Sequence, residues 1–124
     1  MTIIKEEGVY AGEFLISECD EGAIGRDAVV IASGQGVLVA GSVLGKITLS
    51  GKFAAYDNSE TNGTEVAAGI LYSQVDATSA DVNSVAITRL AEVKASLLSF
   101  KLDQDSTAQA AALADLKLAN IIAR

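Results

Sequence analysis

The stretch that most constrains the fold spans residues 34–71 and reads GQGVLVAGSVLGKITLSGKFAAYDNSETNGTEVAAGIL. Its apolar segments are very short, are rich in β-branched side chains and are separated by glycines. Such segments favour short strands joined by tight turns. The sequence therefore predicts an all-β unit in this stretch, and one that is poor in the residue types that usually carry out chemistry.

Strand candidates continue on both sides of this unit. Gly41, Gly45 and Gly51 interrupt the middle strands, as bulges or bends would in a small, strongly curved sheet. Asn62-Gly63 predicts a tight turn within a polar surface hairpin. The segments that we expect to be extended are residues 9–17, 28–32, 37–40, 42–49, 52–56, 67–72, 82–93 and 97–102.

The C-terminal part changes from strand-like to helical patterning. Asp105 or Ser106 can cap a helix over residues 107–118, which are rich in Ala and Leu. Its apolar stripe should pack on the sheet, and because Gln109 shares this stripe, burial should fade toward the helix start. After a left-handed residue at Asn120, residues 121–123 can form a short extended segment. The stripe consists of Ala112, Leu113, Leu116 and Ala119.

Together these elements predict a mostly β (α+β) fold, namely a small curved β-sheet or barrel-like domain with one C-terminal helix. A chain of 124 residues forms one domain of modest core size. Hydrophobic residues make up 50% of it, yet it has only 3 Phe, 3 Tyr and no Trp. Such an excess of small apolar residues predicts that partner subunits cover some apolar surface. The alternative is an Ala-rich sequence without a partner.

The charge of the chain limits the possible partners. A net charge of −7 argues against direct binding of nucleic acid, because phosphate contacts need clustered Lys and Arg. No apolar run reaches the roughly 18 residues that a membrane span requires. The start, MTIIKEE, lacks the pattern of a signal peptide, and the single Cys19 allows no intrachain disulfide. These features suggest synthesis in a reducing cytoplasm.

No catalytic set emerges from the sequence. The chain has no His, which removes the commonest general base and the commonest metal ligand. Cys19 is surrounded by acidic residues, a setting that favours an inert side chain over a reactive one. Residues 40–48 (AGSVLGKIT) approach a phosphate-binding loop but lack its first Gly and its Ser or Thr, and Gly34-Gln35-Gly36 lacks the rest of a dinucleotide fingerprint.

Three further kinds of site are also weakly supported. Residues 57–63 (DNSETNG) alternate oxygen ligands as a calcium loop would, but Asn62 and Ala68 stand where the loop needs Gly and Glu. Sixteen acidic residues make chance carboxylate pairs unavoidable, so a glycosidase pair carries little weight. Lys46 and Lys52 have no flanking pattern for a lipoyl-type group. We therefore expect no enzyme activity, no cofactor and no metal.

Four segments in a fixed order carry a resemblance that covers nearly the whole chain. They are GEFLISE (residues 12–18), AGSVLGKI (40–47), Asn62-Gly63 followed by AGIL (68–71), and a C-terminal helix that ends in Ile121-Ile122. Together they resemble the head decoration proteins of lambda-type tailed bacteriophages. The resemblance implies a capsid-stabilising protein of the virion, made in the host cytoplasm. It would bind the major capsid protein as a homotrimer at local threefold sites on the outer surface of the expanded head.

The resemblance also implies a flexible N-terminal arm that contacts the capsid. We expect residues 1–12 to form this arm and residues 13–124 to form the globular domain. The residues that we place in the arm or at its root, as capsid-binding residues, are Ile3, Ile4, Val9, Tyr10 and Phe14. The alternative is a frayed terminus followed by an ordinary core strand. For the function, the alternative is a generic small β-rich binding or scaffold module without catalytic activity.

Overall fold

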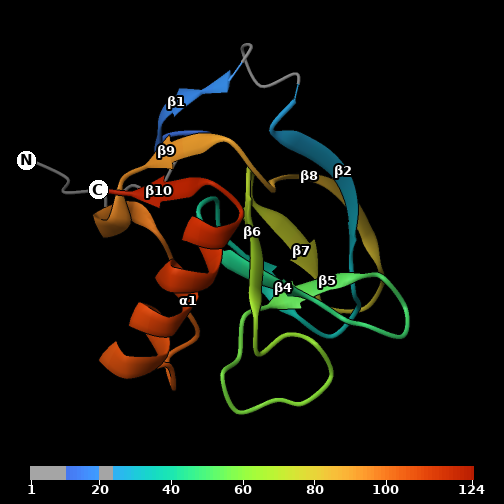
Figure 1. Cartoon of the computed structure of the whole chain (residues 1–124). Helices are drawn as coiled ribbons and strands as arrows, with labels where there is room; N and C mark the ends of the chain where they lie inside the picture. Colours follow the sequence, from blue (N-terminus) through green and yellow to red (C-terminus); the bar gives the residue numbers. More distant parts are fainter. Residues whose placement is uncertain (1–10, 20–23) are drawn as a thin grey trace, which may run out of the picture.

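The computed structural model describes residues 11–19 and 24–124, and in this part the chain is mostly β with one α-helix (Figure 1). This confirms the fold class predicted from the sequence. In chain order the elements are β1 (Leu15–Glu18), β2 (Arg26–Ile31), β3 (Gly36–Leu38), β4 (Val43–Lys46), β5 (Phe53–Ala55), β6 (Ala67–Leu71), β7 (Val75–Ala77), β8 (Val82–Ile87), β9 (Ala91–Val93), the short 3-10 helix η2 (Ala95–Leu97), α1 (Ser106–Leu118) and β10 (Ile121–Ala123).

Five strands close into a barrel in the order β2-β5-β4-β6-β8. β2 and β8 run antiparallel over six pairs, from Arg26↔Ile87 to Ile31↔Val82, and β2 meets β5 through the parallel pair Ile31↔Phe53. Ile31 therefore belongs to the junction that closes the barrel. The predicted barrel-like sheet is confirmed, although β4 (Val43–Lys46) is shorter than the predicted segment 42–49 and β2 (Arg26–Ile31) is longer than the predicted segment 28–32.

Gly45 shows why glycine is needed in the middle strands. The register between β4 and β6 shifts between Leu44 and Gly45, which confirms the predicted irregularity. A Cβ on Gly45 would lie 2.5 Å from the Cα of Thr64, so the connection between β5 and β6 passes directly over β4. β5 and β6 pair with β4 on opposite sides and not with each other. The predicted hairpin around residues 57–63 is therefore wrong; this segment is a crossing loop.

A second sheet, in the order β1-β9-β10, lies at one end of the molecule, above α1 in Figure 1. β1 runs antiparallel and β10 parallel to β9. The predicted single strand over residues 82–93 is wrong, because Leu90 adopts a positive φ of 56° and directs β9 out of the barrel into this sheet. Asn120 has φ 62° and starts β10, as predicted.

The sequence also misplaced one strand and missed another. Residues 97–102 do not form a strand; η2 and an isolated bridge between Ser42 and Ser99 occupy this region. Leu97, Leu98 and Phe100 are all half-buried against the core, and consecutive buried positions do not fit the alternation of a strand. β7, which the sequence did not indicate, pairs only with β3 in a two-stranded sheet.

α1 packs against β6 and β10, and its start is buried as firmly as its middle. Asp105 is the N-cap, and its carboxylate accepts a hydrogen bond from the Ala108 amide at 2.9 Å. The predicted fading of burial toward the helix start is wrong. Ala108 is buried, because the Tyr56 hydroxyl donates a hydrogen bond of 3.0 Å to its carbonyl oxygen and holds the first turn on the barrel.

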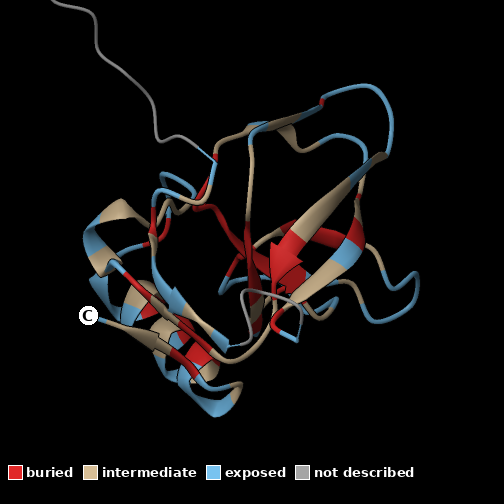
Figure 2. Cartoon of the chain, turned by 90° about the horizontal axis from the view of Figure 1, so that it is seen from above, coloured by how far each residue is buried: buried red, intermediate tan, exposed pale blue. Residues whose placement is uncertain are grey.

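Two apolar clusters form the core, one inside the barrel and one between the barrel, α1 and the β1-β9-β10 sheet. Figure 2 shows the buried segments gathered in the middle of the molecule and the exposed ones in the connecting loops. The second cluster ties the chain ends to the barrel, because it includes Phe14, Leu116 and Ile121.

Candidate functional site

The described chain enters the fold at Gly12, which lies on Tyr72 just after β6. The Gly12 amide donates a hydrogen bond of 3.0 Å to the Tyr72 carbonyl oxygen. Gly12 has φ 71°, and a Cβ there would lie 2.9 Å from the Tyr72 ring, so both the backbone and the space favour glycine. This contact ties the first described residues to the barrel just after β6. We call Gly12, Phe14 and Tyr72 the arm root.

A charged pair also contacts the Tyr72 ring. The guanidinium carbon of Arg26 lies 4.3 Å from the ring centroid, within the range of a cation–π contact. The same guanidinium donates two hydrogen bonds to Glu18, at 2.9 Å and 2.6 Å, and these raise the pKa of Arg26. Since Glu18 ends β1, this bidentate pair ties β1 to the barrel strand β2 beside the arm root.

Phe14 anchors the arm root in the core. Its side chain is completely buried, and its carbonyl oxygen accepts a hydrogen bond of 2.8 Å from the Lys94 amide. The C-terminal residue binds next to this contact, because the amide of Ala95, which follows Lys94, donates a hydrogen bond of 3.1 Å to the Arg124 carbonyl oxygen. Both ends of the described chain therefore converge at the same end of the β1-β9-β10 sheet.

The predicted capsid-binding residues divide into two groups. Ile3, Ile4, Val9 and Tyr10 lie outside the described residues, so their placement in an arm stays a prediction. Phe14 lies at the root, with its ring buried in the domain core. The sequence did not single out Tyr72, which belongs to this root, or the Arg26–Glu18 pair beside it. Nothing in their local sequence marks them, because strands far apart in the chain bring them together.

One hollow brings the carboxylates of Asp57 and Glu60 to the same place. It has a volume of about 150 Å³ and is lined in part by Asp57 and Glu60. Asp57 is buried, and its carboxylate already accepts three hydrogen bonds. They come from the Lys101 ammonium at 2.7 Å, the Ser59 hydroxyl at 2.7 Å and the side-chain amide of Gln104 at 3.2 Å. The hydrogen bond from Lys101 is the main reason that the pKa of Asp57 lies well below its usual range. A carboxylate held ionised in this way cannot serve as a general acid.

This network makes a prediction about pH. The folded state lowers the pKa of Asp57, so its ionised form stabilises the fold above the ordinary value of 3.8, and that contribution is lost as pH falls below it. In urea unfolding, Asp57→Asn should be less stable than the wild type by about 1–3 kcal/mol at neutral pH. The difference should narrow as pH falls from about 5 to about 2.

The control for this prediction is Asp81→Asn. Asp81 also pairs with a lysine, Lys52, at 2.7 Å, but both side chains are well exposed. The Asp81 carboxylate also accepts a hydrogen bond of 2.9 Å from the Ser33 amide. Exposed pairs of this kind contribute little to stability, so this variant should stay close to the wild type in stability, with only a small change as pH falls. A gap between Asp57→Asn and the wild type that stays constant with pH would contradict the assignment.

The segments that resemble a phosphate-binding loop and a dinucleotide fingerprint belong to the framework of the fold and not to a nucleotide site. Residues 40–48 run into β4, where Gly45 packs on Thr64, and no helix follows as a phosphate loop would need. Gln35, between the glycines of residues 34–36, accepts a hydrogen bond of 3.0 Å from the Ala55 amide. Among residues 11–19 and 24–124, no group of three or more His, Cys, Asp or Glu side chains could hold a metal ion. No helix in the same residues is long and apolar enough to cross a membrane.

Comparison with known proteins supplies the identity of the family. A search of curated proteins finds no match to the chain. A family model described as bacteriophage lambda head decoration protein D matches residues 4–121, which is almost the entire sequence. The match includes the arm root, the barrel, α1 and the start of β10. The chain therefore belongs to the bacteriophage lambda head decoration protein family, whose members are structural components of the virion.

Proposed function

We propose that this protein binds the outer surface of the expanded phage head as trimers at local threefold sites and stabilises the head against the pressure of packaged DNA. The observation that carries the proposal is the family match over residues 4–121. The mechanism is mass action: a ligand that binds the expanded lattice, and not the loosened one, stabilises the expanded lattice by an amount that grows with the ligand concentration relative to its Kd.

The N-terminal segment is the part that we propose contacts the major capsid protein. Residues 1–12 would pair with a strand edge of that protein through backbone hydrogen bonds, while Ile3, Ile4, Val9 and Tyr10 fill pockets beside it. The arm root supports this role because it fixes the start of the segment through buried Phe14. One arm binds weakly because it loses conformational entropy on docking, whereas three arms on one trimer give strong avidity.

Charge supports the outer surface over the interior of the head. The chain carries a net charge of −7 and would be repelled by packaged DNA. On the outer surface of the head the protein does not meet this repulsion. Before assembly, the same charge keeps unbound copies soluble in the host cytoplasm, where we propose the protein is made.

The arm is tested by co-sedimentation with expanded empty heads of the phage that encodes the protein. Deletion of residues 1–10 and the double variant Ile3→Ser/Ile4→Ser should each weaken binding by a factor of about ten or more, because lost avidity multiplies across three arms. The matched control is Ile16→Ser, which changes an exposed isoleucine on β1 in the described domain and should bind as the wild type does.

Each result has a distinct meaning for the function. Equal binding by the wild type and both arm variants would keep decoration and move the contact to the globular domain. Absence of binding by the wild type at high concentration would overturn the proposed function and leave the generic β-rich module.

A further inference from the structure

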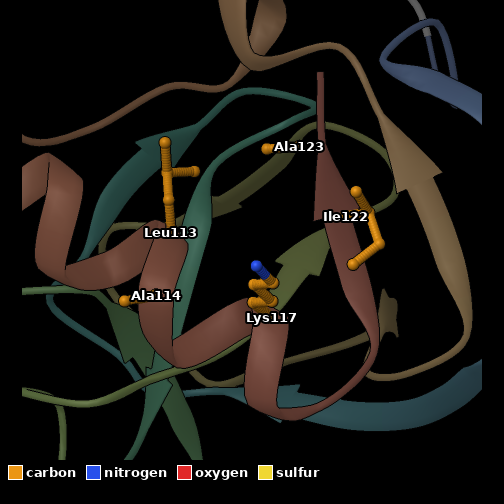
Figure 3. A pocket seen from close by; sticks show the side chains of 5 residues that line it. All are labelled: Leu113, Ala114, Lys117, Ile122 and Ala123. Carbon is orange, nitrogen blue, oxygen red and sulfur yellow. The ribbon is translucent and has the colours of Figure 1, made fainter.

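An apolar hollow with one basic residue lies between α1 and β10 (Figure 3). Its volume is about 260 Å³, which is large enough for a leucine side chain. Figure 3 shows side chains of the helix on one side and side chains of β10 on the other. The lining residues are Leu113, Ala114, Lys117, Ile122 and Ala123. The hollow therefore offers an apolar floor with a cation at its rim.

Lys117 gives this hollow its charge. Its side chain is exposed and forms no ion pair with any residue in the described part of the chain. A matching ligand would carry an aliphatic side chain next to a carboxylate.

The chain itself carries such a pair just before α1. Leu102 is a fully exposed leucine, and exposed Asp103 follows it. The loop around them is held in place by two contacts. The Lys101 ammonium pairs with buried Asp57 at 2.7 Å, and the backbone amide of Gln104 donates a hydrogen bond of 3.0 Å to the Lys101 carbonyl oxygen. This leucine is therefore presented on an ordered loop, which lowers the entropy cost of docking it.

Leu102 cannot serve the hollow of its own chain. It precedes the first turn of α1, whereas the hollow lies along the second half of that helix. From Ser106 to Leu113 alone the helix rises about 10 Å. The side chain and the hollow are thus two separate patches of one molecule, which is the arrangement that a head-to-tail contact between copies needs.

We infer that the Leu102–Asp103 loop of one copy docks in the α1–β10 hollow of the next, with Leu102 in the apolar floor and the Asp103 carboxylate beside Lys117. The inference rests on the proposed trimer and names its subunit contact. Opposite charges allow chains of net charge −7 to approach at this place. Repeated head to tail, the contact closes into a ring, and three copies form the trimer.

The other strongly exposed leucine at a loop tip fits less well. Leu49 is flanked by Thr48 and Ser50, so it brings no carboxylate to Lys117. Among the exposed leucines of residues 11–19 and 24–124, which are Leu49, Leu102 and Leu118, Leu102 alone has an acidic neighbour in the sequence. This charge match is the reason that we choose a second copy of the chain as the occupant.

Cross-linking tests the contact directly. In a Cys19→Ser background, Leu102→Cys combined with Ile122→Cys should give covalent dimers and trimers with a short bis-maleimide, both on expanded heads and in concentrated solution. Either cysteine alone should give monomers, because a head-to-tail contact brings together two different sites. Binding of the uncross-linked wild type to heads is measured in parallel.

The outcomes separate this inference from the proposed function. Head binding without cross-links in the double variant would overturn the inference and leave decoration intact. Cross-linked trimers in solution without head binding would support the contact and count against decoration. Cross-links in a single-cysteine variant, or none under either condition, would overturn the head-to-tail contact.

A charge exchange provides a second test in the full chain. Asp103→Lys and Lys117→Glu should each weaken self-association by about two- to fivefold per contact, and the double variant should restore it. Both side chains are exposed, but the Asp103 carboxylate accepts a hydrogen bond of 3.1 Å from the Gln104 side chain, so circular dichroism of each variant must first match that of the wild type. Failure of the double variant to recover would overturn the pairing of Asp103 with Lys117.

Discussion

Replacing Gly63 by alanine is expected to lower the free energy of unfolding by about 3–5 kcal/mol, since it combines backbone strain with overpacking. Gly63 has φ 111°, and a Cβ there would lie 2.3 Å from the Lys46 carbonyl oxygen and 2.9 Å from the Thr48 amide nitrogen. Both contacts are to the backbone around the end of β4, so no side-chain rotation can relieve them. Urea unfolding followed by circular dichroism measures the loss.

The matched control for this change is Gly34→Ala. Gly34 also has a positive φ, of 87°, but a Cβ there meets nothing within 4 Å. It should cost only the backbone term, about 1–2 kcal/mol. The difference between the two variants isolates the close approach of the crossing loop to β4. Equal losses would show that the loop does not pack on β4 as described.

The second large effect is expected at the arm root. Phe14→Ala should lower the free energy of unfolding by about 3–5 kcal/mol, because it removes a completely buried aromatic ring from the cluster between α1 and the barrel. Ile16→Ala, two residues later in β1, changes an exposed side chain and should alter stability by no more than about 0.5 kcal/mol.

Measuring head binding distinguishes two possible roles of Phe14, a buried anchor in the domain core and a direct contact with the capsid. Phe14→Leu keeps most of the buried volume, so this variant should fold and bind heads nearly as the wild type does. Strong loss of head binding in a stable Phe14→Leu variant would show that the ring itself contacts the capsid, and would contradict its assignment as a buried anchor.

The parts of the fold that the sequence predicted correctly are those set by local chemistry. Asp105 caps α1 because its side chain reaches an amide three residues along, and Asn120 ends the helix region because it tolerates a positive φ. The register shift at Gly45 could also be predicted from the sequence, because a glycine within a strand pattern indicates a bulge or a bend. Such features depend on neighbouring residues and can be derived from the sequence alone.

The errors arise where distant contacts override local pattern. Residues 82–93 look like one strand, yet Leu90 turns the chain because β9 has partners on both sides, in β1 and β10. Residues 97–102 look extended but are fixed by contacts with the core and by the pair between Lys101 and Asp57. Burial of Ala108 depends on the hydroxyl of Tyr56, which lies far away in the sequence.

The candidate site shows the same limit. Resemblance drew attention to residues 12–18, which contain Gly12 and Phe14. It did not indicate that Tyr72 and Arg26 would complete the root, because the barrel brings β2 and the end of β6 next to the incoming chain. The hollow between α1 and β10 could not be foreseen either, since it depends on how the last strand returns along the helix.

The most direct test of decoration is the number of copies bound per head at saturation, measured on expanded and on unexpanded empty heads of the same phage. We predict saturable binding to expanded heads at about three copies per local threefold site, with little binding to unexpanded heads. Equal binding to both forms, or binding that does not saturate, would contradict the claim that this protein recognises and stabilises the expanded lattice.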